Sequence, residues 1–166
     1  MGIEVSLTPE ECRICRLLGD LRRSNNRDAG VKDLLVAKED PMERDVQGVA
    51  AEMAFAKYYN LYPPVDVHAR SGGEDFMLNG RKIDVKQTKY PDGRLIVPPY
   101  KVEKDGGSDN YVLITGTMPN FVIQGHARKE DLCDPKNLVM LRSLVYALPI
   151  EELREMPEYE RNSTRN

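Results

Sequence analysis

The sequence lacks the features that would place this chain in a membrane or in an oxidising compartment. No apolar run approaches the roughly 20 residues that a membrane-spanning helix needs. The first residues, MGIEVSLTPEE, contain neither the cationic stretch nor the apolar stretch of a signal peptide. Three cysteines are an odd number, which argues against a disulfide framework. We therefore expect a cytoplasmic protein without membrane contact.

A surplus of positive charge is missing as well. The chain has 24 Lys and Arg against 27 Asp and Glu, a formal net charge of −3. This balance excludes a histone-like binder of polyanions, so a nucleic-acid site must come from local asymmetry. Residues 39–78 hold three Lys or Arg and eight Asp or Glu, whereas residues 79–104 hold seven and three. An acidic segment next to a basic one is what a site that binds a cation and a polyanion together would need. Ordinary variation of charge along a protein surface explains the same pattern equally well.

Signals for two helices are followed by the alternating pattern of strands. The segments TPEE and DPME each combine an N-cap residue with proline at the first helical position, and they predict helices over residues 9–23 and 41–59. Period-two alternation predicts strands, and short helices follow them. The expected strands are 75–79, 81–90, 94–97, 111–117 and 121–127, and the expected short helices are 128–133 and 149–156. Residues 138–146 fit a strand or a helix.

The length of 166 residues suits one domain with its own core. We expect an α/β fold in which a mostly antiparallel sheet carries helices on at least one face. Residues 1–38 would form a helical N-terminal extension, residues 40–127 the core and residues 128–156 the closing elements of one domain spanning 1–156. Residues 157–166 are polar and would form a flexible tail.

The turn Asn79-Gly80 sets the register of a β-hairpin in the middle of the chain. With a two-residue turn, Phe76 faces Ile83 and Asp75 faces Asp84. Alternation then places the apolar residues on one face, and Asp75, Asp84 and Lys86 on the other. Opposed Cβ atoms lie roughly 4.5–5.5 Å apart, so the two carboxylates would repel unless a divalent cation lay between them. The alternative is a pair of solvated aspartates with Lys86 as their ion-pair partner.

Glu52 adds a third acidic group. It lies inside the apolar arc of the second predicted helix, three residues from both Val49 and Phe55, so it should face the sheet. Gly48, one turn earlier, removes a side chain and would let a backbone or a phosphate approach. The alternative for Glu52 is a boundary residue that pairs with a lysine or an arginine.

These residues, in this order, resemble the PD-(D/E)xK nuclease superfamily. The matching positions are Glu52 on a helix, Asp75 on one strand and Asp84-Val85-Lys86 on its partner, within residues 40–127. The later segments GHARKEDL and YALPIEEL are similar to the closing elements of small phage and archaeal members. One departure is Glu74, which stands at the position of the motif's proline, a residue that family members often lack, and Glu74 could itself be a ligand. The resemblance implies a restriction-endonuclease-like core, with a mixed, mostly antiparallel sheet of four to five strands flanked by helices.

What the resemblance implies is a Mg²⁺-dependent (or Mn²⁺-dependent) endonuclease that hydrolyses DNA phosphodiester bonds. Asp75 and Asp84 would hold the metal with the backbone carbonyl of Val85, and Glu52 would orient its waters or hold a second ion. Lys86 would position or help to deprotonate the attacking water and offset charge in the transition state.

Four further residues are candidate contacts to DNA, and other patterns are not functional signals. The four residues are Thr88, Lys89, Arg22 and Arg23.

A homodimer is compatible with this activity, because cutting both strands needs two sites. Two alternatives stay open: a catalytically inactive module on the same fold that binds nucleic acid or protein, and a structural protein. The C-x-x-C at Cys12 and Cys15 lacks the further ligands that a zinc site needs, and His68 is most simply a surface histidine.

Overall fold

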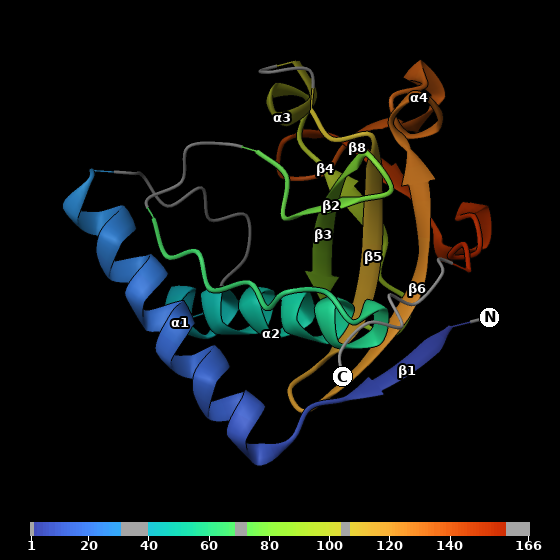
Figure 1. Ribbon diagram of the computed structural model, residues 1–166. Coiled ribbons are helices and arrows are strands. Elements are labelled where there is room, and N and C mark those ends of the chain that lie inside the picture. The colour runs from blue at the N-terminus through green and yellow to red at the C-terminus, as the bar shows by residue number, and fades with distance from the viewer. Residues whose placement is uncertain (1, 31–39, 69–72, 104–106, 159–166) are drawn as a thin grey trace.

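The computed structural model describes residues 2–30, 40–68, 73–103 and 107–158, which fold into helices and two sheets (Figure 1). The helices are α1 (Pro9–Asp28), α2 (Pro41–Tyr59), α3 (Pro99–Glu103) and α4 (Lys129–Leu132), with 3-10 turns at η2 (Pro135–Asn137) and η3 (Ile150–Glu152). The strands are β1 (Ile3–Ser6), β2 (Phe76–Leu78), β3 (Arg81–Thr88), β4 (Leu95–Val97), β5 (Asn110–Thr117), β6 (Asn120–Arg128), β7 (Leu138–Met140) and β8 (Leu144–Leu148). Among these helices, none has the length and apolar character to cross a membrane.

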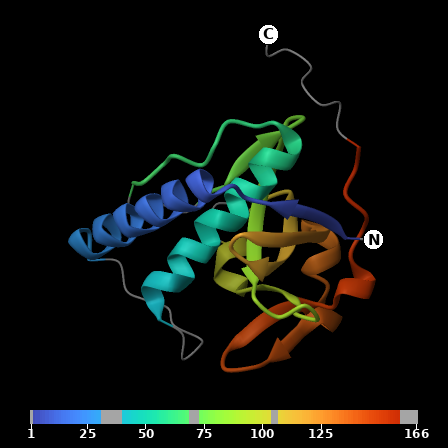
Figure 2. The same ribbon diagram turned by 90° about the horizontal axis from the view of Figure 1, so that it is seen from below.

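The main sheet is mixed, and it lies between a helical layer and a second, smaller sheet. Its strand order is β1-β6-β5-β3-β2, with β3 parallel to β5 and the other neighbours antiparallel. The smaller sheet has the antiparallel order β4-β8-β7. Helix α2 covers one face of the main sheet, α1 packs against α2, and the smaller sheet lies on the opposite side (Figures 1 and 2). The α/β class and a main sheet of this size agree with the prediction.

Both long helices begin where their capping residues predict. The Thr8 hydroxyl accepts a hydrogen bond from the Glu11 amide at 3.2 Å, and the Glu11 carboxylate accepts one from the Thr8 amide at 2.8 Å, which completes a capping box. Helix α2 ends at Asn60, which adopts the left-handed conformation with φ of 52°. The predicted end of α1 near residue 23 is wrong, because the helix continues to Asp28. Its last turns make tertiary contacts, such as the bond from Asn25 to the Val67 carbonyl, that outweigh the low helix propensity of SNN.

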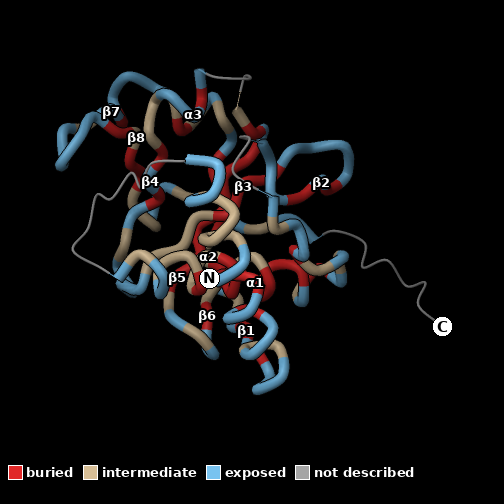
Figure 3. Tube along the Cα trace, turned by 90° about the vertical axis from the view of Figure 1, so that its left-hand side faces the viewer, coloured by how far each residue is buried: buried red, intermediate tan, exposed pale blue. Residues whose placement is uncertain are grey.

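The two faces of the main sheet pack against different cores, and this arrangement positions the candidate site. Ile83 and Val85 pack with Phe55 of α2 in the larger core, whereas Tyr111 and Leu113 of β5 belong to the smaller core against β4 and β8. Figure 3 shows α2 largely buried and the β7 segment largely exposed. In the register of the parallel pair, Asp84 lies beside Tyr111 and Lys86 beside Leu113. Asp84 and Lys86 are therefore on the face opposite to α2.

Several sequence predictions of secondary structure were wrong at the ends of the chain. Residues 1–38 are not purely a helical extension, because β1 pairs with β6 as an edge strand of the main sheet. Residues 138–146 contain β7 and the start of β8 rather than a helix, and the helix expected over 149–156 is only the three-residue turn η3. The short helix α3 was not among the predicted elements. Most of the predicted tail, residues 159–166, lies outside the described residues.

Candidate acidic site beside the β2–β3 hairpin

The hairpin has the predicted register, but the chain bends at Asp75. Leu78 pairs with Arg81 and Phe76 with Ile83, and β2 leaves β3 beyond that point, while β3 runs on to Thr88. The Asp75 amide donates to the Ile83 carbonyl at 2.9 Å, and the Asp75 carboxylate accepts from the Val85 amide at 2.7 Å. A carboxylate thus satisfies the strand-edge donor that a longer β2 would have satisfied. Asp75 and Asp84 are consequently not a directly opposed strand pair.

Asp84 and Lys86 form an ion pair on the outer face of β3. Asp84 is buried, and the Lys86 side chain is 21% exposed; its ammonium group contacts the Asp84 carboxylate. Burial lowers the pKa of Lys86, but the charges of Asp84 and Asp75 raise it by more, so the pKa of Lys86 lies above its usual value. Lys86 is therefore a permanent cation in this setting. It can attract a phosphate or stabilise a developing negative charge, but it cannot accept a proton.

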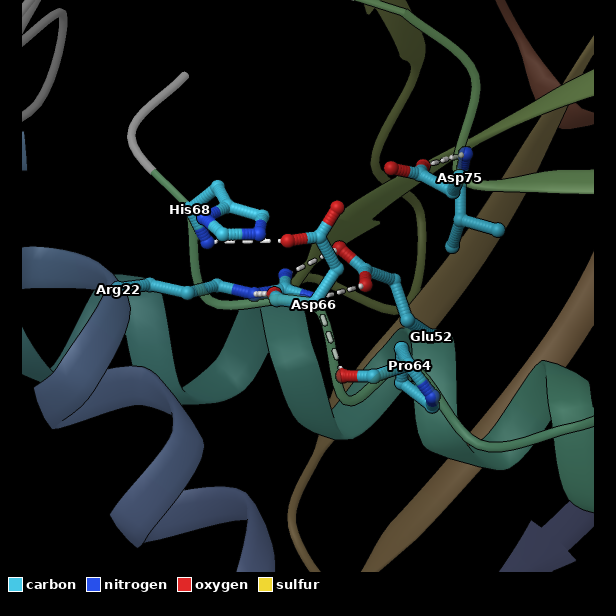
Figure 4. Close-up of polar contacts among 7 residues, drawn as sticks. Arg22, Glu52, Pro64, Asp66, His68 and Asp75 are labelled. Carbon is cyan, nitrogen blue, oxygen red and sulfur yellow. Dashed lines mark hydrogen bonds and ion pairs between the residues drawn. The ribbon is translucent and has the colours of Figure 1, made fainter. Parts of the chain in front are cut away.

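Glu52 extends from α2 and is held by Arg22 of α1. The two terminal nitrogens of Arg22 each donate to a different oxygen of Glu52 at 3.0 Å (Figure 4). The same guanidinium donates to the carbonyls of Asp66 at 2.7 Å and Pro64 at 3.2 Å. Desolvation raises the pKa of Glu52 above its usual value, an effect that Arg22 only partly offsets. Arg22 therefore connects both helices with the segment that leads to the hairpin.

The acidic groups of the site interact with one another and outnumber its cations. Desolvation, followed by the charges of Glu52 and Asp84, raises the pKa of Asp75 well above its usual value. Because Asp75 is an exposed residue, the two neighbouring carboxylates are the firmer reason for this direction. Three carboxylates thus face two cationic groups, Arg22 and Lys86, which leaves one negative charge. A proton or a metal cation would neutralise it.

The other residues predicted to contact DNA make their contacts outside this cluster. Arg23 pairs with Asp45 at 3.5 Å on the α1–α2 interface. The Thr88 hydroxyl accepts from the amide of Tyr90 at 3.4 Å, and the Lys89 ammonium lies 5.2 Å from the centre of the Tyr90 ring. Arg22 is part of the site through Glu52, which differs from the role as a DNA contact that its place in the sequence suggested.

Three predictions outside the acidic cluster can be compared with the structure. Glu74 is exposed next to Asp75, and His68 is exposed with its amide bonded to the Asp66 carboxylate. Cys12 and Cys15 are free thiols, and burial raises the pKa of Cys15 to about 12. A thiol that is protonated at every physiological pH is a poor metal ligand, because the ligand is the thiolate.

The sequence analysis named Arg22 only as a DNA contact and did not name Tyr111, and both residues shape the site. The pairing of Glu52 with Arg22 is the alternative that the sequence left open for Glu52. Arg22 reaches Glu52 across 30 positions of sequence, and neither the spacing nor the composition connects them. Tyr111 lies beside Asp84 only because β3 and β5 are parallel. Its buried hydroxyl accepts from the Ser108 amide at 3.1 Å, and the charge of Asp84 contributes to a raised pKa of Tyr111, after desolvation as the main cause. Tyr111 is the first residue of a predicted apolar strand, so the sequence pattern indicates only an ordinary core residue there.

The described residues contain no group of three or more His, Cys, Asp or Glu side chains arranged to hold a metal ion. Comparison of the chain with protein-family models, with curated proteins and with solved structures gave no significant match. The function must therefore be argued from the acidic cluster itself.

The excess negative charge predicts opposite effects for two isosteric substitutions. Asp75→Asn should raise the melting temperature in EDTA at pH 8, because the amide oxygen can still accept from Val85 while the repulsion is removed. Since the folded pKa of Asp75 is raised, the native state holds its proton to higher pH than the unfolded state does, so this repulsion costs stability as pH rises above about 4. The gain should disappear near pH 4. Asp84→Asn should lower the melting temperature, because it leaves Lys86 without its partner. A rise for Asp84→Asn, or none for Asp75→Asn, would contradict this charge assignment.

Proposed function

We propose that this protein is a metal-dependent endonuclease that hydrolyses DNA phosphodiester bonds. The observation that supports the proposal is the mutual electrostatic influence of Glu52, Asp75, Asp84 and Lys86 beside a hairpin whose register follows the sequence. Helix α2 supplies Glu52, the bend before β2 supplies Asp75, and β3 supplies Asp84 and Lys86, in the order that resembles PD-(D/E)xK nucleases. The excess of one carboxylate and the upward pKa of Asp75 support affinity for a cation.

The residues present fit Mg²⁺ in kind and in number. This ion is usually held by one or two carboxylates, with water and phosphate oxygens completing its shell, so a group of three protein ligands is not required. Asp75 and Asp84 would supply the carboxylates and Val85 a backbone carbonyl. When bound, the ion would lower the pKa of the attacking water and neutralise the leaving oxygen.

Lys86, Glu52 and Arg22 would each have a separate role in the reaction. Lys86, a permanent cation, would hold the scissile phosphate and offset its growing charge, and it would do so from a position fixed by Asp84. Glu52 would accept hydrogen bonds from water on the α2 side. Arg22 would keep that carboxylate in place, because both Glu52 oxygens already accept from one planar guanidinium.

The second candidate is a module on the same fold that binds nucleic acid without cutting it. The observation in its favour is that Arg22–Glu52 and Asp84–Lys86 are complete ion pairs without any ligand. A binding module would need no metal at these carboxylates.

Incubation with labelled DNA distinguishes the candidates. Single-stranded, duplex and branched DNA should each be incubated with wild-type protein in Mg²⁺, Mn²⁺ or EDTA, with Asp84→Asn as the matched inactive variant. We expect metal-dependent cleavage of at least one substrate by wild type and none by the variant. Binding without cleavage in either metal would favour the binding module, and neither binding nor cleavage would exclude both.

Gly48 tests whether DNA approaches α2 beside Glu52. A Cβ atom at Gly48 would meet nothing within 4 Å, so Gly48→Ala should fold normally. Alanine in a helix interior is worth about 1 kcal/mol over glycine, which should raise the melting temperature. If a phosphate lies against this turn, the same substitution should weaken DNA binding severalfold. Met42→Ala, at a 44% exposed position of the same helix, tests general effects of a change on this surface. Unchanged DNA affinity with the expected stabilisation would place the DNA elsewhere.

A further inference from the structure

A pocket of about 350 Å³ lies next to Asp75, and its lining includes Pro64, Asp66 and Asp75 from the contacts described above. Its walls come from the segment after α2 and from the start of β2. The lining residues that matter here are Tyr62, Pro63, Pro64, Asp66, Asp75 and Met77. One carboxylate, that of Asp75, therefore lines the pocket and also contacts the hairpin in the candidate active site.

The lining combines flat apolar surfaces with carboxylates. Tyr62 is 71% exposed and Met77 is 53% exposed, although both are large apolar side chains beside two prolines. Among the residues that the structure describes, no lysine or arginine lines the pocket. A phosphate would therefore be repelled, whereas a flat neutral ring could stack on the apolar side chains and donate hydrogen bonds to a carboxylate.

Two hydrogen bonds hold Asp66 in a defined position in the pocket wall. Its carbonyl accepts from Arg22 at 2.7 Å, and its carboxylate accepts from the His68 amide at 3.0 Å (Figure 4). Arg22, through its bonds to Glu52, fixes the pocket wall relative to the acidic cluster. A group in the pocket would therefore be held at a fixed place beside the candidate metal-binding carboxylates.

We propose that this pocket binds an unpaired nucleobase, that of a nucleotide adjoining the phosphate to be cut. The base would stack on Tyr62 and donate from an exocyclic amine to Asp66. This inference rests on the proposed function. It gives the substrate class: single-stranded, branched or mismatched DNA, in which the base is already unstacked, should be preferred over regular duplex, in which extrusion costs a few kcal/mol.

The test uses 2-aminopurine, a fluorescent base that carries an exocyclic amine and is quenched by stacking. A single-stranded oligonucleotide with one 2-aminopurine is titrated with wild-type protein, Tyr62→Ala, Asp66→Asn and the control Tyr100→Ala in EDTA. Tyr100 is a 48% exposed tyrosine of α3 outside the pocket. We expect quenching by wild type and Tyr100→Ala, and an affinity loss on the order of 5- to 100-fold for Tyr62→Ala. Asp66→Asn should weaken binding of 2-aminopurine more than of an abasic oligonucleotide.

The outcomes separate this inference from the proposed function. If wild type cuts DNA but Tyr62→Ala behaves as Tyr100→Ala does, the pocket does not bind a base and the inference is overturned alone. If quenching depends on Tyr62 but no DNA is cut in any metal, the nuclease proposal fails and the base pocket stands. Absence of quenching by wild-type protein overturns the inference whatever the cleavage assay gives.

Discussion

Lys86→Ala is expected to lower the single-turnover rate of DNA cleavage by a factor on the order of 10²–10⁴, as removal of one electrostatic catalytic group does. The reason is that a permanent cation would be lost from beside the phosphate. Affinity for Mg²⁺ should be kept or improved, because a positive charge next to the carboxylates is gone. Affinity for DNA should fall only modestly, since one phosphate contact among several is lost.

This experiment needs two controls, because Lys86 also pairs with the buried Asp84. Melting temperatures show whether Lys86→Ala is folded at the assay temperature. Lys136→Ala removes an exposed lysine of η2 and should leave the rate unchanged. A folded Lys86→Ala that cuts as fast as wild type would reduce Lys86 to an ion-pair partner, and the catalytic assignment of Asp84-Val85-Lys86 would be wrong.

The hairpin could be predicted from the sequence because its information is local. The turn Asn79-Gly80 fixes which residues pair, and period-two alternation fixes which face each side chain joins. The start of each long helix was predictable for the same reason, since a cap bonds to residues two or three positions away. Phe76, Leu78, Ile83 and Val85 are in the larger core as predicted.

Contacts distant in sequence could not be predicted in this way. The pairing of β2 with β3 ends at Phe76, and the chain bends at Asp75. A rule based on the turn alone extends the pairing to Asp75 and Asp84, so it does not predict the bend. Strand β1 is four residues long and gains its stability from β6, more than 110 positions later, so no local pattern marks it. The parallel pairing of β3 with β5 likewise brought Tyr111 beside Asp84 without a signal in either segment. The candidate residues could thus be named from the sequence, but their hydrogen bonds could not.

A substitution at Arg22 tests whether this residue holds Glu52 in place or only contacts DNA. Arg22→Ala should lower the free energy of unfolding at pH 8 by about 3 kcal/mol, because Glu52, with a side chain only 13% exposed, loses its partner. Without Arg22, desolvation should raise the pKa of Glu52 further, so the native state keeps the proton to higher pH and the loss should shrink as pH falls toward 5.

Urea unfolding at both pH values measures the effect of Arg22→Ala, and Glu52→Gln completes a double-mutant cycle in which the two substitutions should be strongly non-additive. Arg22→Lys should rescue only part of the stability, because an ammonium cannot replace the two parallel bonds of the guanidinium. In the cleavage assay kcat should fall while KM changes little, since Glu52 is misplaced rather than DNA released. Unchanged stability together with weaker, less salt-sensitive DNA binding would contradict this prediction. Arg22 would then be a surface contact to DNA, as its position at the end of the first helix suggested.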